Sequence, residues 1–284
     1  MKKLVLALSA VAAFSAPALA ADMAAKAPMR AAPIAQVASW TGCYISVGGG
    51  YGMFRLDHNE RANIAGIGPA NTLIAGQETS GGDGWLFTGG GGCDYQVSPS
   101  WVIGGFADGT WSDLRGDHGT KLFSFDDTAV VGQVKQDWSW AVGGRVGYLV
   151  NPTFLSYVSA GYTEAHLNAT NLNHIPFDGG LFTGAQLPGQ TVNGYFIGTG
   201  FEYRMDWLPG LFIRSEGRAN VYTRKDALPT CVSAGTLCAG PGVPGVVGAF
   251  GGFSQVEDRR LITYTGKVEV VYRFNWAGPL VAKY

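Results

Sequence analysis

Apolar and polar positions alternate with a period of two residues along eight segments of the chain. In the first segment, WTGCYISVGGGYGMF, the larger apolar side chains Ile45, Val47 and Met53 share one face and small residues share the other. Since successive side chains of a strand point to opposite faces, this pattern predicts β-strands with two unlike faces. The predicted strands cover residues 40–54, 85–97, 101–114, 135–149, 154–167, 192–205, 211–224 and 258–274.

The connections between these strands alternate in length. Residues 98–100, 150–153 and 206–210 are tight turns rich in Ser, Pro and Gly, whereas residues 55–84, 115–134, 168–191 and 225–257 are long loops. Amphipathic strands joined alternately by short turns and long loops are typical of outer-membrane barrels. The sheet must close on itself, because lipid cannot satisfy a free strand edge. The predicted fold class is therefore all-β: an eight-stranded antiparallel transmembrane β-barrel over residues 40–274.

The apolar face of each strand is expected to contact lipid, and the polar face to line the interior. The fifth strand stays ambiguous, because Tyr157 and Val158 leave both of its faces apolar, and the outward face of the seventh strand holds mostly small residues. The interior set predicted in this way contains ten charged residues: Asp108, Arg145, Glu202, Arg204, Arg214, Glu216, Arg218, Lys267, Glu269 and Arg273.

These interior charges have two interpretations. Unpaired charges in a narrow barrel are costly, so we expect them to form an ion-pair network. An eight-stranded barrel is only just wide enough for its own side chains to fill. This width favours a structural plug over a charged pore lining, and a small or gated channel remains the alternative.

The chain ends carry different signals. MKK, the apolar run LVLALSAVAAFSA and the small residues Ala18 and Ala20 predict a signal peptide over residues 1–20. Residues 21–39 are an Ala/Pro-rich segment without periodicity and predict a flexible periplasmic lead-in. Residues 275–284 either extend the last strand or form a periplasmic tail. No other stretch approaches the ~20 apolar residues of a membrane helix.

Composition excludes several classes of protein. The 43 glycines are too many for a helical protein, and 8 Trp, 12 Tyr and 15 Phe are too many for a disordered linker. A formal net charge of −1 gives no basic surface for nucleic acid. The one exact G-x-G-x-x-G spacing, Gly240 to Gly245, lies in a proline-rich stretch without a helix to bind phosphate. We therefore expect no cofactor.

Four cysteines are expected to form disulfides in an oxidising compartment. Cys231 and Cys238, with six residues between them, predict one disulfide. Cys43 and Cys93 share a face at similar depth on neighbouring strands, which predicts a close cross-strand pair able to bond if its geometry allows. Metal binding is the alternative, but none of the four histidines (His58, His118, His166 and His174) lies near a cysteine in sequence.

The histidines and the aromatic residues are placed by the same strand pattern. All four histidines are expected in loops or outer strand ends. Some small barrels are lipid-modifying enzymes with a Ser–His pair at the membrane rim, and His166 lies two residues from Glu164 on the same side of a strand. Ordinary loop polarity is favoured, and no catalytic or metal-binding residue is predicted. The aromatic residues predict two girdles. Trp40, Tyr95, Trp101, Tyr148, Trp207 and Trp276 form the girdle near the short turns, and Trp85 and Trp111 form the one near the long loops.

Five stretches of the chain together resemble one family. They are WTGCYISVGGGYG, CDYQVSPSWVIGGFAD, GGRVGYLVNPTFLSYVSAGYT, GTGFEYRM and the ending VVYRFNWAGPLVAKY. They are similar to the small outer-membrane proteins called outer membrane immunogenic proteins, within the opacity-like porin superfamily. The resemblance implies an eight-stranded barrel with a periplasmic N-terminus, four surface loops and no shared catalytic residues. The chain departs from the family pattern at Cys43 and Cys93 and in the length of 225–257.

The resemblance also implies an abundant surface antigen with a role in envelope integrity, porin-like permeability or host contact. We expect a structural barrel in the outer membrane of a Gram-negative bacterium rather than an enzyme. A small porin-like channel and a loop-borne adhesin or ligand-binding protein, with haem among the ligands, are the alternatives. The expected partners are outer-membrane lipid, lipopolysaccharide and the barrel assembly machinery, which would recognise Tyr272 and Phe274 in the last strand.

Overall fold

The computed structural model describes residues 39–64, 72–122, 128–174, 180–234, 238 and 253–274. The predicted signal peptide, lead-in residues 21–38, the tail 275–284 with Trp276, and the glycine motif at 240–245 lie outside these residues. Among the described residues, no helix is long and apolar enough to cross a bilayer.

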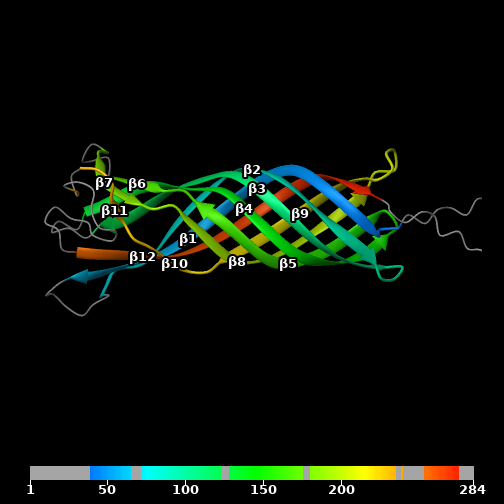
Figure 1. Ribbon diagram of the computed structural model, residues 1–284, viewed down its shortest axis with the longest axis horizontal. Coiled ribbons are helices and arrows are strands. Elements are labelled where there is room, and N and C mark those ends of the chain that lie inside the picture. Colours follow the sequence, from blue (N-terminus) through cyan, green and yellow to red (C-terminus); the bar gives the residue numbers. More distant parts are fainter. Residues whose placement is uncertain are drawn as a thin grey trace, which may run out of the picture. The chain divides into compact units, whose positions relative to one another are not determined.

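Eight long antiparallel strands form a closed barrel (Figure 1). They are β1 (Gly42–Ile64), β2 (Thr72–Gln96), β3 (Trp101–Leu122), β4 (Thr128–Asn151), β5 (Phe154–Leu167), β8 (Gln190–Arg204), β9 (Leu211–Tyr222) and β12 (Phe253–Phe274). Each strand pairs with the next one around the barrel, and β1 pairs with β12 from Cys43↔Phe274 to Ile64↔Phe253 to close the ring. The all-β class and the eight-stranded antiparallel barrel are confirmed.

The strands run further than the alternating pattern predicted. Most of 55–84 and 115–134 is continuous strand in β1 to β4, so the prediction of loops there was wrong. Polar residues such as His58 and His118 occupy interior positions in this part, so the apolar alternation is lost although the pairing of the backbones continues.

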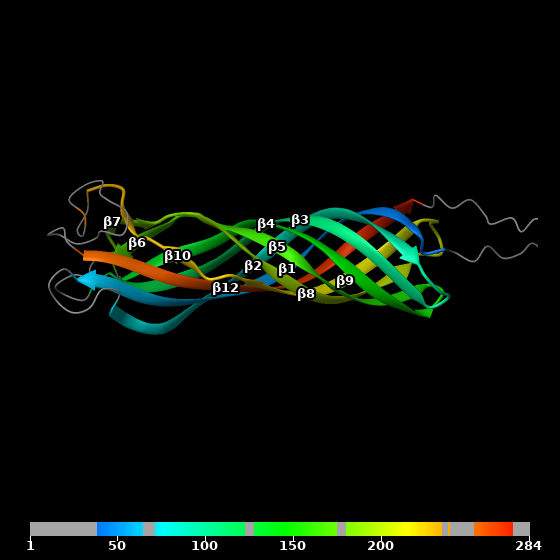
Figure 2. The ribbon, with the colours of Figure 1, turned by 60° about the horizontal axis from the view of Figure 1, so that its bottom comes forward.

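Four short strands lie within the two remaining predicted loops. They are β6 (Thr170–His174), β7 (Phe182–Leu187), β10 (Lys225–Ala227) and β11 (Thr230–Cys231). β6 pairs with β4, β7 with β6, β11 with β7, and β10 with β12 (Figure 2). Backbone pairing thus continues beyond the eight long strands at the end of the barrel opposite the short turns.

The interior is stacked in layers along the barrel axis. On β3 the inward side chains Val102, Asp108, Leu114 and His118 each belong to a different layer. The floor layer, at the short-turn end, consists of Trp40, Tyr44, Val102, Leu149, Leu155, Phe212 and Val271. The charged layer lies above it. The upper apolar layer comes next and consists of Phe54, Leu56, Leu114, Val134, Ala165, Leu167, Val192, Tyr222 and Leu261. Beyond it lie His58, His118 and Glu257, also buried.

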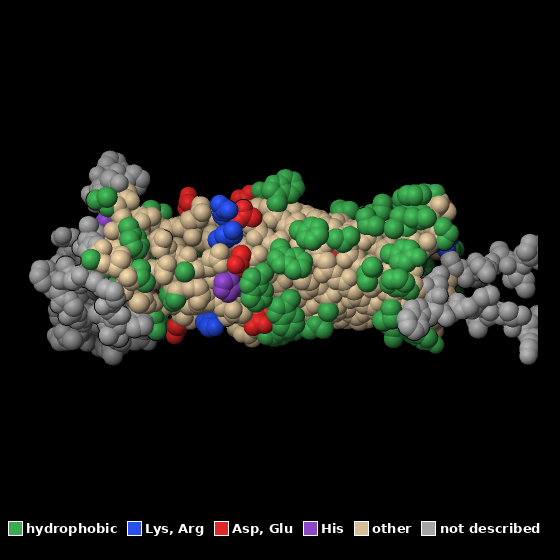
Figure 3. Space-filling view, turned by 45° about the horizontal axis from the view of Figure 1, so that its top comes forward, with side chains coloured by type: hydrophobic (Ala, Val, Ile, Leu, Met, Phe, Trp, Pro, Cys, Tyr) green, Lys and Arg blue, Asp and Glu red, His purple; other side chains and the backbone are tan. Residues whose placement is uncertain are grey.

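On the face shown in Figure 3, hydrophobic side chains gather near the short turns and again near the middle of the barrel, and a band of charged side chains lies beyond the second group. On β3 the apolar stretch runs from Trp101 to Trp111, about 33 Å along the strand and about 25 Å along the axis at a tilt of ~40°. That height matches the apolar band of outer-membrane barrels, ~25 Å. Arg55, Asp113 and Arg115, all about half exposed, mark the charged band.

The orientations of two side-chain sets depend on tertiary packing. On β5, Tyr157 points into the barrel at 3% exposure and Val158 points out at 60%, which resolves the ambiguous fifth strand. Trp40 was predicted in the lipid-facing girdle, and this was wrong. Its ring is 2% exposed and packs against Phe212 inside the floor layer, with Nε1 donating to the carbonyl of Pro152. Trp40 precedes β1, so its side chain can turn inward under the barrel.

Candidate functional site: the charged layer inside the barrel

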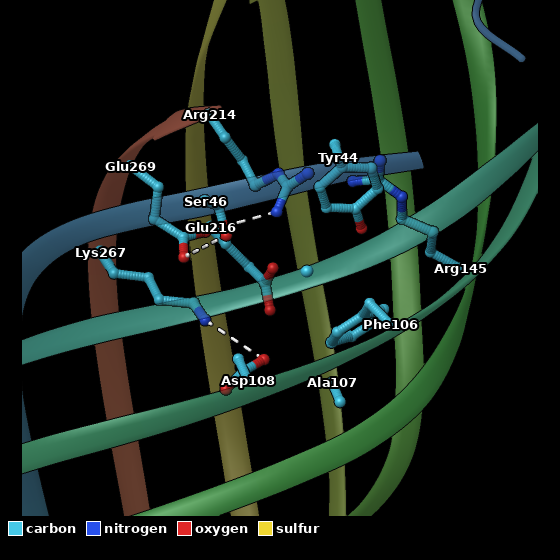
Figure 4. A pocket seen from close by; sticks show the side chains of 11 residues that line it. Tyr44, Ser46, Phe106, Ala107, Asp108, Arg145, Arg214, Glu216, Lys267 and Glu269 are labelled. Atoms are coloured by element: carbon cyan, nitrogen blue, oxygen red, sulfur yellow. Dashed lines mark hydrogen bonds and ion pairs between the residues drawn. The ribbon is translucent and has the colours of Figure 1, made fainter. Parts of the chain in front are cut away.

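The charged layer is built from alternate positions of the strands around the barrel. Arg214, Glu216 and Arg218 on β9 show the rule, because a period of two keeps all three on the interior face. The structure places nine of the ten predicted residues in this layer with side chains at most 7% exposed: Asp108, Arg145, Glu202, Arg214, Glu216, Arg218, Lys267, Glu269 and Arg273. Figure 4 shows many of them converging from opposite walls of the barrel.

Glu202 and Asp94 are the centre of the lower half of the layer. The Glu202 carboxylate accepts hydrogen bonds from Arg145 Nη1 at 3.1 Å, Arg214 Nη2 at 3.0 Å and Arg273 Nη2 at 2.6 Å. Asp94 accepts from Arg145 Nε at 2.9 Å and from Arg273 Nη1 at 2.7 Å. All three guanidinium groups lie within 5.2 Å of the centre of the Tyr44 ring. The cations are therefore held by carboxylates and by an aromatic face together.

Arg218 is the centre of the upper half. Its Nη1 and Nη2 donate to the two oxygens of Asp108 at 3.0 and 2.8 Å, and its Nε donates to Glu216 at 2.7 Å. Lys267 Nζ lies 3.6 Å from Asp108, and the Tyr157 hydroxyl donates to Glu216 at 2.9 Å. The two parallel hydrogen bonds from Arg218 to Asp108 hold the guanidinium group and the carboxylate in a single relative orientation.

The charges of the layer balance. Its five cations are Arg145, Arg214, Arg218, Lys267 and Arg273, and its five carboxylates are Asp94, Asp108, Glu202, Glu216 and Glu269. A balanced layer has no excess charge with which to attract either anions or cations. Pairs such as Arg218–Asp108 and Arg145–Glu202 join residues of different strands, so the layer cross-links the wall of the barrel.

Two residues differ from the sequence-based set. Asp94 was missed, although it follows outward-facing Cys93 and precedes outward-facing Tyr95, which is the signal that places it inside. Arg204 was placed in the interior, which needs correction. It is the last residue of β8, its side chain is 26% exposed, and its nearest acidic partner is Asp206 at 3.5 Å in the adjoining turn. A strand end at the rim lets a long side chain reach water.

A polar chamber lies between the charged layer and the upper apolar layer. Thr110, Ser112, Ser139 and Thr163 line it together with Gln136, Asn220 and Thr263. The Thr263 hydroxyl donates to Gln136 Oε1 at 3.0 Å, and Asn220 donates to the Thr263 carbonyl at 3.3 Å. Leu86 and Leu114 also line this chamber, and Leu114 belongs to the upper apolar layer.

All four cysteines lie within the described residues, and none is free. Cys43 and Cys93 stand directly opposite each other in the pairing of β1 with β2, and a disulfide joins them across a Cα–Cα distance of 3.9 Å. Cys231 and Cys238 are joined in the buried cluster that contains Leu172, Ala185 and Leu187.

The prediction that every histidine lies in a loop or outer strand end was wrong for His58 and His118. Their side chains are 1% and 0% exposed and face the interior beyond the upper apolar layer. Burial lowers the pKa of His118, and this effect outweighs the nearby Glu257 carboxylate, which raises it. Burial raises the pKa of Glu257, but Arg259 and His118 more than offset this and hold it well below its usual range.

His166 lies on the outside and does not pair with Glu164. Its Nδ1 is 2.8 Å from Asp137, and its ring stacks on Trp138 with centres 5.5 Å apart. Glu164 instead accepts a hydrogen bond from Trp140 Nε1 at 2.9 Å. His166 and Glu164 therefore have different partners, although they lie on the same side of β5.

No family model matches the sequence, and no curated protein does. Solved structures with similar folds include the outer membrane protease OmpT from Escherichia coli, at 13% identity and a TM-score of 0.44 over 81% of this chain and 97% of that chain. The outer membrane protein OprG from Pseudomonas aeruginosa matches at 11% identity and 0.45, over 84% and 99%. Neisserial surface protein A matches at 14% and 0.32, over 80% and 99%. Sequence identities and TM-scores this low carry no argument about activity.

Proposed function

We propose that this chain is a structural outer-membrane β-barrel with a plugged interior, a surface protein that supports envelope integrity and acts as an antigen. The closed sheet leaves no free edge among its eight long strands, as a strand-built membrane span requires. The exposed apolar belt, with Trp101 and Tyr148 at one end and Trp85 and Trp111 at the other, is the surface that would contact lipid. On its sequence motifs we also propose membership of the opacity-like family.

The observation that supports the plug is the ion-paired, charge-balanced layer across the barrel. A permeating ion would have to separate buried pairs such as Arg218–Asp108 and Arg145–Asp94, leaving charges uncompensated in a medium of low dielectric constant. It would also have to cross the floor layer and the upper apolar layer, where Leu155, Leu56 and Leu114 are fully buried. Both steps argue against a steady open pore and support the plug.

A small porin-like channel is the second candidate, and the polar chamber favours it. Its hydroxyl and amide lining is suited to water or small solutes, so a rearrangement of the upper apolar layer would open a path into it. Ligand binding or host contact through the loops is a third interpretation, which the chamber neither favours nor opposes.

Planar-bilayer recordings test the plug against the channel. The refolded mature chain, beginning at Ala21, is expected to give no steady single-channel steps. The Arg218→Ala variant is expected to stay silent as well, because both apolar layers remain in place. Reproducible wild-type steps whose size or ion selectivity changes in Arg218→Ala would overturn the plug and favour the channel.

The proposed partners are suggested by the same surface. Lipid and lipopolysaccharide would contact the exposed belt and the charged band. Tyr272 and Phe274 remain our proposed recognition element for the assembly machinery. Both point outward at 44% and 41% exposure, with ring centres 5.1 Å apart at the end of β12.

A further inference from the structure

Three side chains with metal-binding chemistry converge inside the barrel beyond the upper apolar layer. His58 comes from β1, His118 from β3 and Glu257 from β12, and their side chains are at most 1% exposed. One ring nitrogen of each histidine and a carboxylate oxygen of Glu257 all lie within 4.8 Å of one another. The cluster belongs to neither the charged layer nor the polar chamber, so a role for it is independent of the proposed function.

His58, one of the three residues, has a buried ring nitrogen without a partner in the described part of the chain. Its Nε2 lies 3.1 Å from the carbonyl oxygen of Gly119. A carbonyl can only accept, so this contact places the proton on Nε2 and leaves a lone pair on Nδ1. Nδ1 is buried and has no hydrogen-bond partner among the described residues. A buried acceptor without a partner costs about 1–3 kcal/mol, and a bound cation would remove that cost.

His118 has the same feature. Its Nδ1 lies 2.9 Å from Ser80 Oγ. Its Nε2 is 3.0 Å from Glu257 Oε1, yet it makes no hydrogen bond with acceptable geometry among the described residues. His118 Nε2 and Glu257 Oε1 are therefore within hydrogen-bond distance, but the angle at the nitrogen is not that of a hydrogen bond.

We propose that His58, His118 and Glu257 bind a divalent transition-metal ion of the zinc class. Two imidazole nitrogens and one carboxylate oxygen form a common zinc ligand set, which leaves a fourth position for water. Bonds of about 2.0–2.2 Å place two ligand atoms about 3.0–3.5 Å apart. His118 Nε2 and Glu257 Oε1 already stand at that separation. The separations that involve His58, at most 4.8 Å, would shorten to that range on binding.

The surroundings support the ligands as the outer contacts of metal sites do. Gly119 and Ser80 hold the two imidazole rings through their other nitrogens, and Arg259 Nε donates to the Glu257 carboxylate at 2.7 Å. Nitrogen-rich donor sets favour zinc, copper or nickel over magnesium and calcium. Glu78, whose carboxylate is 3.7 Å from His58 Nε2 and 42% exposed, connects the cluster to solvent.

Zinc binding by the full mature chain, refolded in detergent without an affinity tag and stripped with EDTA, tests the site. Isothermal titration is expected to show one Zn²⁺ ion per chain, with at least a tenfold loss of affinity in His118→Ala and in His58→Ala. His166→Ala is the matched control, because His166 lies on the outer surface, and its affinity is expected to stay at the wild-type value. No zinc uptake by the wild type, or equal affinity in all three variants, would mean that the cluster is only a buried polar contact among His58, His118 and Glu257.

X-ray absorption of the zinc-loaded wild type keeps the proposal testable if a variant fails to fold. The expected spectrum contains two imidazole ligands and oxygen donors. A spectrum without imidazole scattering would overturn the site. Folding of each variant is followed by the mobility of unheated samples in SDS gels, and His118→Asn serves as the second variant if His118→Ala does not fold.

Discussion

At the scale of the residue, Glu202 shows what the interior charges contribute. It is fully buried and accepts hydrogen bonds from Arg145, Arg214 and Arg273, which come from β4, β9 and β12. A single carboxylate therefore ties three other strands to β8. Its removal would leave three guanidinium groups in a dry interior with only part of their compensating charge, which is the most costly way to break a buried network.

Glu202→Gln is expected to lower the free energy of unfolding by about 3 kcal/mol or more, because the amide keeps the shape but loses the charge. The measurement is equilibrium unfolding of the refolded barrel in guanidinium chloride. Arg204→Gln is the control, since its exposed contact with Asp206 is worth less than about 1 kcal/mol. Equal small effects in both variants would show that the buried network does not stabilise the barrel.

At the scale of the element, β1 shows why the chain is rich in glycine. Gly48, Gly50 and Gly52 occupy interior positions where β12 approaches closely. A Cβ atom on Gly50 would overlap the carbonyl oxygen of Gly266 and come within 2.8 Å of the Lys267 Cα atom. The glycine face of β1 therefore gives space to the charged layer on the strands around it, and no phosphate-binding loop is needed to explain it.

Gly50→Val is expected to destabilise the barrel by about 1–3 kcal/mol through overpacking. Gly217→Val on β9 is the matched variant. A Cβ atom there meets no atom of the described residues within 4 Å, and the new side chain would add apolar surface to a sparse outer face. We expect Gly217→Val to unfold at the wild-type denaturant concentration or above. A Gly50→Val barrel as stable as the Gly217→Val barrel would contradict the steric role of the interior glycines.

At the scale of the whole barrel, the two ends differ in chemistry. Tight turns such as 206–210 close one end below the floor layer, while β6, β7, β10 and β11 build up the other end beyond the charged band. If the apolar belt lies in the outer membrane, the elaborated end faces the cell exterior and the tight turns face the periplasm.

Cysteine labelling in intact cells checks this sidedness. Leu181→Cys, at a position 61% exposed beside β7, is expected to react with a membrane-impermeant maleimide. Asp206→Cys, in a short turn where the side chain is 69% exposed, is expected to react only after the outer membrane is permeabilised. The opposite pattern, or equal labelling of both positions in intact cells, would contradict the proposed orientation.

The sequence by itself determined the number of long barrel strands, their order and the direction of most side chains. A period of two needs no knowledge of distant residues, because each strand alternates its faces locally. Arg214, Glu216 and Arg218 could be placed inside on that basis alone, and so could Asp94, had the alternation of β2 been followed past Cys93.

Only the tertiary structure decided which interior groups meet. Three arrangements join residues far apart in the chain: the pairing of Glu202 with three arginines, the inward turn of Trp40, and the convergence of His58 with His118 and Glu257. His58 and Glu257 are separated by 199 positions in sequence. These contacts are set by the register in which several strands pair. The alternation within a single strand does not specify that register. The length of β1 to β4 also depends on neighbouring strands. These strands extend past the apolar belt because hydrogen bonding between them continues where the alternation of apolar side chains has ended.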